Sequence, residues 1–342
     1  MPDTDYSRRK FLGQATSLAA AMALGVKSMG AQSDKPLVIG TGNAKYSVHH
    51  DWLTAPEGML FGDTHGVAQD AKGHIYVAHT VHPDSKSSDA IAVYDKSGKF
   101  LTSWGSQFKG GAHGLDIRKE GREEFIYHCD VAHRKVSKTK LDGTVVWELG
   151  TPDASGKYAK GEPYIPTNVA FSPNGDFYVA DGYGSNWIHQ YDLKGNYLRT
   201  FGGPGSDPGQ VSQPHGIWLD PRGKEPLLAV ADRANRRIQY FSLDGKHVKF
   251  VTAGMRLPCH FSVRKEMMLV PDLQSVITLL DEDNKVIEHL GDGDPSNLRG
   301  HPRSDFIPGK FIHPHDAMFL ANGDILVAEW VPIGRVTLLK KV

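Results

Sequence analysis

Short apolar runs separated by turn residues recur along the chain, and no sustained helical period follows residue 31. Each repeat begins with a strand whose first residue is polar. An apolar strand follows, closing mostly on an acid, and then two strands joined by a turn. The first strands begin 45 to 55 residues apart, at His65, His113, Thr167, His215, His260 and His315. Four short strands in each of six such units predict an all-β fold, a six-bladed β-propeller.

The sixth repeat has only three strands before the chain reaches Val342. We expect the fourth strand to come from the N-terminal stretch between Pro36 and His50, so that an N-terminal strand closes the ring. Closure would remove the free sheet edges that otherwise pair with other chains. Residues 32–342 are therefore predicted to form a single propeller domain.

The first 31 residues have the layout of an export signal. Residues 7–12 read Ser-Arg-Arg-Lys-Phe-Leu, an apolar stretch continues to Val26, and small residues follow at 28–31. The arginine pair is typical of a twin-arginine signal peptide. The apolar run is shorter than the ~20 residues that span a bilayer. We therefore expect a protein exported to the periplasm or outside the cell, without membrane association after cleavage. An uncleaved anchor or a chance basic start is the alternative.

Composition excludes several classes of function. The 342 residues contain 39 Lys+Arg and 39 Asp+Glu, so the charge that attracts nucleic acid is missing. With only two cysteines, Cys129 and Cys259, the chain is neither a disulfide scaffold nor a Cys-rich zinc module. The expected partner is a small-molecule or peptide-like substrate, and the expected state is a monomer.

Histidine is the exception in this composition, with 17 residues. Because the first strand of each propeller blade lines the central channel, equivalent positions form a ring, and five of its six residues are His. His113, His215 and His315 come from alternate blades and should approach the axis from directions about 120° apart. Three imidazoles with an open fourth position are typical of catalytic zinc or a similar divalent metal. The alternative is that these side chains only fill the strand starts.

One segment carries a resemblance to a known repeat. Residues 201–220, FGGPGSDPGQVSQPHGIWLD, are similar to the linker and first strand of the NHL repeat. Within that class the chain resembles peptidylglycine α-hydroxyglycine amidating lyases, which are six-bladed zinc propellers. The similarity covers roughly 60–342, and the shared pieces lie in the same order at 112–117, 180–188, 214–217, 231–241 and 314–318.

The resemblance implies two metals. It supports zinc on the three alternate-blade histidines, His113, His215 and His315. It also implies a structural calcium ion held by two backbone carbonyls and one carboxylate, those of Val67, Leu115 and Asp316. Hard oxygen ligands of this kind suit calcium.

The resemblance also implies two catalytic residues. Tyr183 matches the family's catalytic tyrosine, and a phenol near zinc would have its pKa lowered and could act as a base. Its alternative is a strand-end tyrosine packed at the channel mouth. Arg233 matches a family arginine that could clamp a substrate carboxylate. Its alternative is a salt bridge to a neighbouring blade.

The chain departs from the family pattern near the channel mouth. Thr80 stands where the family has a second catalytic arginine. Additional histidines that could form a second metal site or transfer protons are His65, His79, His260 and His313.

The favoured hypothesis is an exported metal-dependent, lyase-like enzyme that cleaves the C–N bond of an α-hydroxyglycine-type carbinolamide. One alternative is a non-catalytic NHL-propeller binding module, because fold alone does not imply activity. Another is a metal-dependent hydrolase, such as a lactonase, on the same fold.

Overall fold

The computed structural model describes residues 36–159, 161–293 and 298–342. The predicted signal peptide at 1–31 lies outside these residues. Residues Leu37–Val342 form one compact unit. No helix in the described part of the chain has the length and apolar character needed to cross a membrane.

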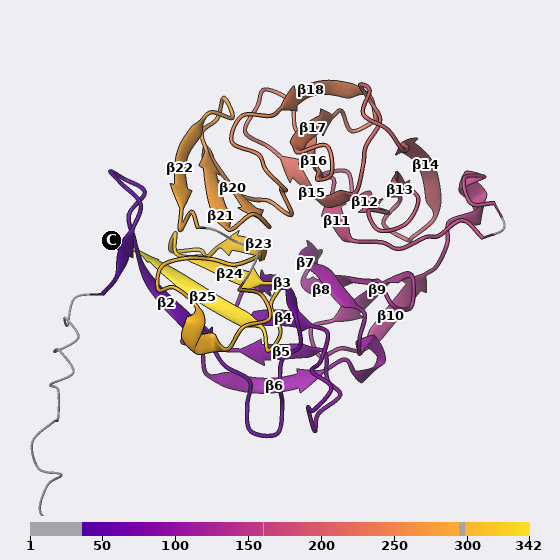
Figure 1. Cartoon of the computed structure of the whole chain (residues 1–342). Helices are drawn as coiled ribbons and strands as arrows, with labels where there is room; N and C mark the ends of the chain where they lie inside the picture. The colour runs from indigo at the N-terminus through magenta and orange to yellow at the C-terminus, as the bar shows by residue number, and fades with distance from the viewer. Residues whose placement is uncertain (1–35, 160, 294–297) are drawn as a thin grey trace, which may run out of the picture. The chain divides into compact units, whose positions relative to one another are not determined.

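Six antiparallel sheets are arranged around a central axis, which confirms the predicted six-bladed propeller (Figure 1). Blade 1 contains β3 (Thr64–Gln69), β4 (Ile75–His79), β5 (Ile91–Tyr94) and β6 (Phe100–Trp104). Blade 2 contains β7 (Ala112–Glu120), β8 (Glu123–Asp130), β9 (Lys135–Lys140) and β10 (Val145–Leu149). Blade 3 contains β11 (Asn168–Phe171), β12 (Phe177–Ala180), β13 (Trp187–Tyr191) and β14 (Tyr197–Gly202).

The remaining blades follow the same plan, with the first strand of each nearest the axis. Blade 4 contains β15 (Pro214–Asp220), β16 (Leu227–Asp232), β17 (Arg237–Phe241) and β18 (His247–Val251). Blade 5 contains β19 (Ser262–Arg264), β20 (Met267–Asp272), β21 (Val276–Leu280) and β22 (Val286–Leu290). Blade 6 contains β23 (Pro314–Phe319), β24 (Ile325–Glu329) and β25 (Arg335–Lys341). Short 3₁₀ turns occur at Ser106–Phe108, Asp153–Ser155 and Arg303–Asp305.

An N-terminal strand completes blade 6, as expected. Strand β2 (Tyr46–Leu53) pairs antiparallel with β25, with Val48 opposite Leu339, and β1 (Val38–Ile39) adds a short outer strand. The strand runs on to Leu53, beyond the predicted limit of the closing stretch. The two ends of the propeller are therefore joined through one sheet.

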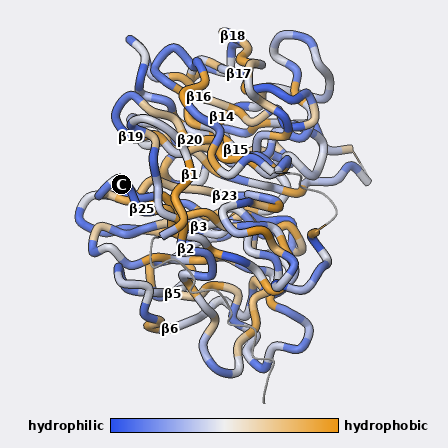
Figure 2. Tube along the Cα trace, turned by 60° about the vertical axis from the view of Figure 1, so that its left-hand side comes forward, coloured by the Kyte–Doolittle hydropathy of each residue, from blue (hydrophilic) through white to orange (hydrophobic). Residues whose placement is uncertain are grey.

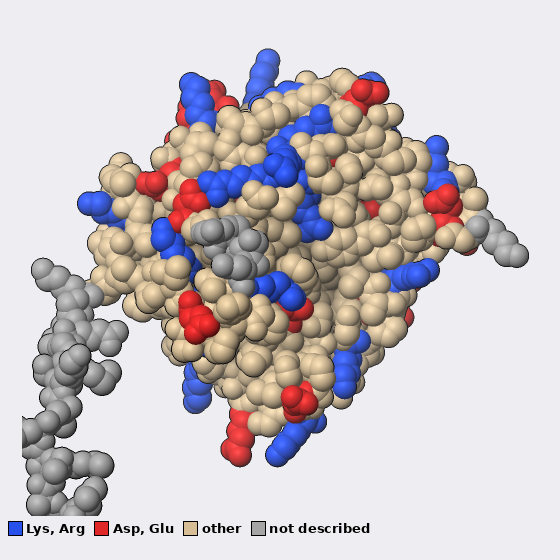
Figure 3. All heavy atoms as spheres, in the orientation of Figure 1, with Lys and Arg blue, Asp and Glu red and all other residues tan. Residues whose placement is uncertain are grey.

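Apolar side chains fill the spaces between adjacent blades. One cluster joins Leu53 of the closing strand to Val77 of blade 1 and Leu326 of blade 6. Figure 2 shows apolar stretches along the strands and polar residues in the connecting turns. Lys and Arg residues are interspersed with Asp and Glu on the face displayed in Figure 3, as expected from the balanced composition.

Tyr46 tests the importance of the closing strand because its side chain is only 1% exposed and packs in the cluster shared with blade 5. Tyr46→Ala should lower the free energy of unfolding by about 3 kcal/mol or more, the usual cost of truncating a buried aromatic residue. Tyr46→Phe, the matched control, should stay within about 1 kcal/mol of wild type. Denaturant unfolding would measure both, and an unchanged Tyr46→Ala midpoint would contradict a stabilising role for the closing strand.

Candidate metal centre on the propeller axis

Four axial histidines share one backbone feature. Each lies in a register shift, a β-bulge, at the start of the first strand of its blade, and these residues are His65, His113, His215 and His315. A bulge re-aims a side chain relative to the regular in-and-out alternation of the strand. A glycine follows three of them, and a Cβ atom on Gly114 or Gly216 would come within 2.3 Å of a carbonyl oxygen in the next blade. The local sequence therefore allows the inner strands to approach closely.

Hydrogen bonds to the next blade fix the orientation of three rings. The Nδ1 atoms of His113, His215 and His315 each lie 2.8 Å from a backbone carbonyl oxygen, those of Thr167, Cys259 and His65. A carbonyl oxygen only accepts, so each Nδ1 carries the proton. The lone pair is then on Nε2, the atom that binds a metal in many histidine sites.

The three predicted ligands come together on the axis. Their ring centroids lie 4.6 to 4.9 Å apart, and each residue is 2–3% exposed. Burial lowers the pKa of His113 to about 4, and it lowers the pKa values of His215 and His315 well below their usual value. The rings are therefore neutral and able to coordinate a metal at ordinary pH. A cavity of about 10 Å³ lies among them.

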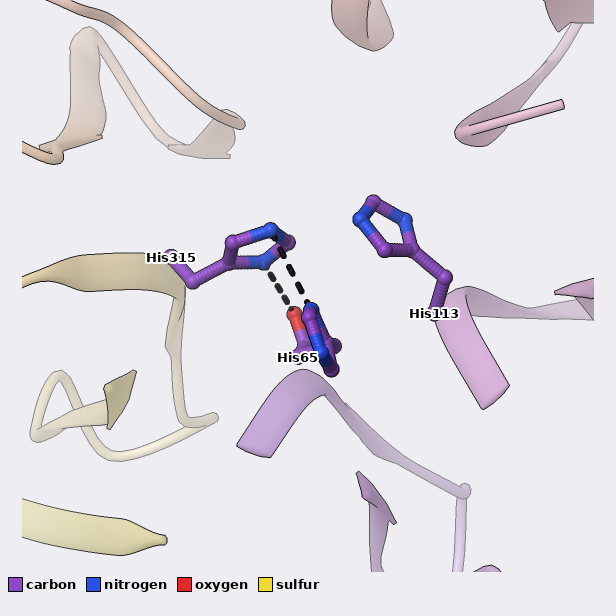
Figure 4. Close-up of side chains that lie close together, drawn as sticks. All are labelled: His65, His113 and His315. Atoms are coloured by element: carbon purple, nitrogen blue, oxygen red, sulfur yellow. Dashed lines mark hydrogen bonds between the residues drawn. The ribbon is translucent and has the colours of Figure 1, made fainter. Parts of the chain in front are cut away.

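His65 joins this cluster, although sequence reasoning placed it outside the main triad. One nitrogen from each of His65, His113 and His315 lies within 4.8 Å of the others, a set that could hold a metal ion (Figure 4). His65 Nδ1 is 3.3 Å from His315 Nε2. Its side chain is also buried, and burial lowers its pKa well below the usual value.

The donor set fits a divalent transition metal. Tyr183 brings its hydroxyl oxygen to 3.3 Å from His113 Nε2 and 3.0 Å from His215 Nε2. The phenol has one proton to donate, so it can satisfy only one of these two lone pairs. Several nitrogen lone pairs therefore face each other in a buried space without enough protons, and a cation would satisfy them. Neutral imidazole nitrogens suit zinc and related ions.

Arg233 approaches the same site from blade 4. Its Cζ atom lies 5.2 Å from the centroid of the Tyr183 ring, and its Nη1 lies 3.8 Å from Cys259 Sγ. Arg233 is only 6% exposed, and among the described residues it has no carboxylate within salt-bridge distance. The ion pair to a neighbouring blade that was its alternative role is therefore not seen. Burial raises the pKa of Tyr183, and Arg233 opposes that rise.

A second polar layer contains the residues implied for calcium. Asp316 uses Oδ1 to contact His260 Nδ1 at 2.5 Å, and its Oδ2 accepts the Val67 N–H at 2.9 Å. Leu115 is fully buried. Each Asp316 oxygen therefore has one hydrogen-bond partner and keeps further acceptor capacity. The calcium ion at Val67, Leu115 and Asp316 stays a prediction.

His260 is held as a cation. Its Nε2 lies 3.2 Å from Asn168 Oδ1 and 3.7 Å from Asp116 Oδ2. Burial alone lowers the pKa of His260, but the two carboxylates of Asp316 and Asp116 outweigh it and raise the pKa to about 10. His260 is thus an ion-pair residue in the second layer.

The other two predicted histidines, His79 and His313, lie apart from the axial histidine cluster. His79 packs against Phe61 with ring centroids 4.7 Å apart, and its Nδ1 accepts the Val81 N–H. His313 is partly buried, contacts Trp330, and donates from Nδ1 to the Leu273 carbonyl. Neither residue has an axial histidine as a hydrogen-bond partner in the described chain.

An arginine that sequence reasoning missed lies near Thr80. The Thr80 hydroxyl accepts the Asp63 N–H, and Asp63 is paired at 2.6 Å with Arg299. The Arg299 Cζ atom lies 3.7 Å from the Trp330 ring centroid, and its charge contributes to lowering the pKa of His65. The loop before blade 6 thus brings an arginine near the position where the family arginine is replaced by threonine.

The fold and the axial histidines define a six-bladed propeller with a candidate metal centre. No family model matches the chain. The chain is 28% identical over 207 residues to NHL repeat-containing protein 3 of Homo sapiens, covering 58% of this chain and 57% of that protein. A solved streptogramin B lyase shares the fold, with a TM-score of 0.58 and 14% identity over 88% of this chain and 99% of that one.

Amidating lyases are among the chain's relatives, which confirms the predicted resemblance. The chain is 34% identical over 283 residues to peptidyl-alpha-hydroxyglycine alpha-amidating lyase 1 of Drosophila melanogaster, covering 72% of this chain and 48% of the fly protein. A probable lyase of this name from Caenorhabditis elegans is 28% identical over 205 residues, covering 53% and 56%. The chain spans about half the length of these relatives. Their names agree with the expectation of a lyase-like enzyme.

The His260 ion pair should make stability pH-dependent. Because the pKa of His260 rises from 6.5 to about 10 on folding, its contribution is complete below about pH 6.5 and is lost as the pH rises through 10. We expect this residue to add a slope of up to about 1.4 kcal/mol per pH unit between these values. Urea unfolding at pH 6.5 to 9.5 should show that slope in wild type.

His260→Gln should flatten the slope. The control is His128→Gln, because burial lowers the pKa of His128 to about 3 and this residue does not titrate in the window. An equal slope in wild type and His260→Gln would show that the imidazole is not charged in the folded protein.

Proposed function

We propose that the protein is an exported, metal-dependent lyase acting on α-hydroxyglycine-type carbinolamides. In such a substrate one carbon carries both a hydroxyl group and an amide nitrogen. Removal of the hydroxyl proton forms a carbonyl group as the C–N bond breaks, and the departing amide nitrogen gains a proton. The products are a primary amide and an aldehyde, which is glyoxylate when that carbon also carries a carboxylate.

His113, His215 and His315 would hold the metal, which we propose to be zinc. When bound, such an ion polarises an oxygen ligand and makes its proton easier to remove. The fixed Nδ1–H···O=C hydrogen bonds keep the three Nε2 lone pairs directed at the axis without further reorganisation. The convergence of these three buried, neutral imidazoles is the observation that carries the proposal.

Tyr183 is the proposed acid–base residue. Its hydroxyl lies within hydrogen-bond distance of two axial rings, so a substrate oxygen bound there would lie close to the phenol. In the described chain, burial keeps the phenol protonated. A neighbouring cation and the Arg233 charge both favour the phenolate, which could accept the hydroxyl proton and return it to the amide nitrogen.

Arg233 is the proposed carboxylate-binding residue. A buried guanidinium without an acidic partner is costly, and an anionic substrate group would supply the missing charge. Its position beside Tyr183 places that charge next to the reacting atoms. A non-catalytic propeller module would have no need for converging imidazoles, a phenol and an arginine that has no carboxylate partner among the described residues.

The first experiment is a metal and turnover measurement on protein recovered from the exported fraction of expressing cells. We expect about one zinc per chain by elemental mass spectrometry and release of glyoxylate from an α-hydroxyglycine compound. His113→Ala should lose most of the metal and the activity. Retention of the protein in the cytoplasm would contradict export.

The control is His128→Ala, which removes a buried histidine that bonds Thr139 away from the axis. It should keep the metal content of wild type. Wild-type protein that neither contains nor takes up zinc would favour the binding module instead. Metal-dependent hydrolysis of a lactone without glyoxylate release would favour the hydrolase.

Two substitutions should separate the roles of Tyr183 and Arg233. Tyr183→Phe removes only the hydroxyl group and should lower kcat about 10²- to 10⁴-fold, as expected for an acid–base residue. Arg233→Ala should lower kcat/KM about 10- to 100-fold for a substrate with a carboxylate, the value of one charge-assisted hydrogen bond. A carboxamide analogue is the control and should be almost unaffected by Arg233→Ala. Equal losses with both substrates would exclude carboxylate binding by Arg233.

A further inference from the structure

We propose that His65 is a fourth nitrogen ligand of the axial metal, and that it is the ligand able to leave when substrate binds. This inference rests on the proposed metal site and extends it. Neither the predicted triad nor the names of the relatives assign such a role to blade 1. The argument depends on the backbone, the ring contacts and the hydrogen bonds of His65.

The backbone places His65 in the same class as the three predicted ligands. All four residues lie in a β-bulge of an inner strand. The other two ring positions differ, because Thr167 precedes β11 and His260 precedes β19. The local conformation that directs the three predicted ligands to the axis is therefore also present in blade 1.

The ring of His65 lies at the level of the cluster. Its centroid is 4.6 Å from that of His315 and 4.8 Å from that of His113. His260, by contrast, turns to Asp316 in the second layer. In Figure 4, the His65 ring lies between the blades that carry His315 and His113, with contacts drawn to His315.

The proton positions point to a metal between the rings. His315 Nδ1 donates to the His65 carbonyl, so His315 Nε2 has a lone pair. Without a metal, His65 must donate its Nδ1 proton to that lone pair across 3.3 Å. If the proton of His65 resides on Nε2 instead, the Nδ1 lone pair faces the same point as His315 Nε2. A metal ion at this point would bind both nitrogens.

Among the described residues, the His65 ring also lacks a hydrogen-bond partner outside the cluster. Other buried histidines in the described chain have one, such as Thr139 for His128 and Thr200 for His189. The His65 ring contacts only His315 through a hydrogen bond among the described residues. Coordination of one metal ion by both residues would explain why the His65 ring nitrogen faces only the His315 ring.

The same contacts make His65 the displaceable ligand. His113, His215 and His315 are each tied through Nδ1 to a carbonyl oxygen, so their rings cannot rotate without losing a hydrogen bond. His65 would use Nδ1 for the metal and has no comparable tie. Four imidazoles would close a four-coordinate site, so substrate must replace one of them or expand the coordination.

Zinc-edge X-ray absorption on the zinc-loaded, full-length protein would test this proposal, because outer-shell scattering counts the imidazole ligands. We expect four imidazoles in wild type and three in His65→Ala. The zinc affinity of His65→Ala should fall tenfold or more, because the loss of a residue that only supports a metal ligand already has an effect of that size. His65→Gln, which keeps most of the volume, should also show three. His313→Ala is the matched control and should keep four.

The outcomes separate this inference from the proposed function. Three imidazoles in wild type, unchanged in His65→Ala and His65→Gln, would overturn the role of His65 and leave the zinc triad intact. Wild-type protein that binds no zinc would overturn both proposals. A drop from four to three on substitution of His65 but not of His313 would support the four-nitrogen site.

Discussion

The candidate site depends on three hydrogen bonds from imidazole Nδ1 atoms to backbone carbonyls of the next blade. Each bond both sets the tautomer of a histidine and links two inner strands. The position of every Nε2 lone pair is therefore determined by how the blades are spaced around the axis. That spacing depends in turn on ring closure, in which Tyr46 packs at the start of β2 and Leu53 at its end. A loss of closure at the rim would disturb the arrangement of the axial histidines at the centre.

The axial histidines and the second polar layer around His260 differ in charge. In the axial histidine layer, burial keeps the rings neutral, and no carboxylate among the described residues lies within salt-bridge distance of them. In the second polar layer, Asp316 and Asp116 each contact His260 and keep it charged. The second layer contains a charged side chain of its own, whereas the axial histidines offer lone pairs that could hold a metal ion. The same residue type thus has opposite charge states within one channel because the carboxylates lie on one side only.

Much of this architecture could be predicted from the sequence. The turn spacing gave six blades, and the missing last strand indicated closure by the N-terminal stretch. The ring positions followed from periodicity, which is a property of local sequence. The proximity of Arg299 to Asp63 could not be predicted, because it joins residues 236 positions apart through a loop without a repeat signal. The direction of His260 depends on Asp316, and no strand pattern encodes that pairing.

The pseudo-symmetry of the propeller explains why the side chain at ring position 65, in blade 1, matters. Even-numbered blades supply the histidines whose Nδ1 atoms are hydrogen-bonded, and odd-numbered blades supply the carbonyl oxygens that accept these bonds. The carbonyl belongs to the ring residue itself in blades 1 and 3 and to the residue before it in blade 5. Once its backbone serves that purpose, an odd-blade side chain is free to differ. The Thr167 hydroxyl donates to backbone oxygens and His260 contacts the Asp316 carboxylate, whereas the His65 ring lies within the axial histidine cluster. A change at one odd position can therefore alter the number of imidazoles at the axis without disturbing the three histidines that the Nδ1 hydrogen bonds hold in place.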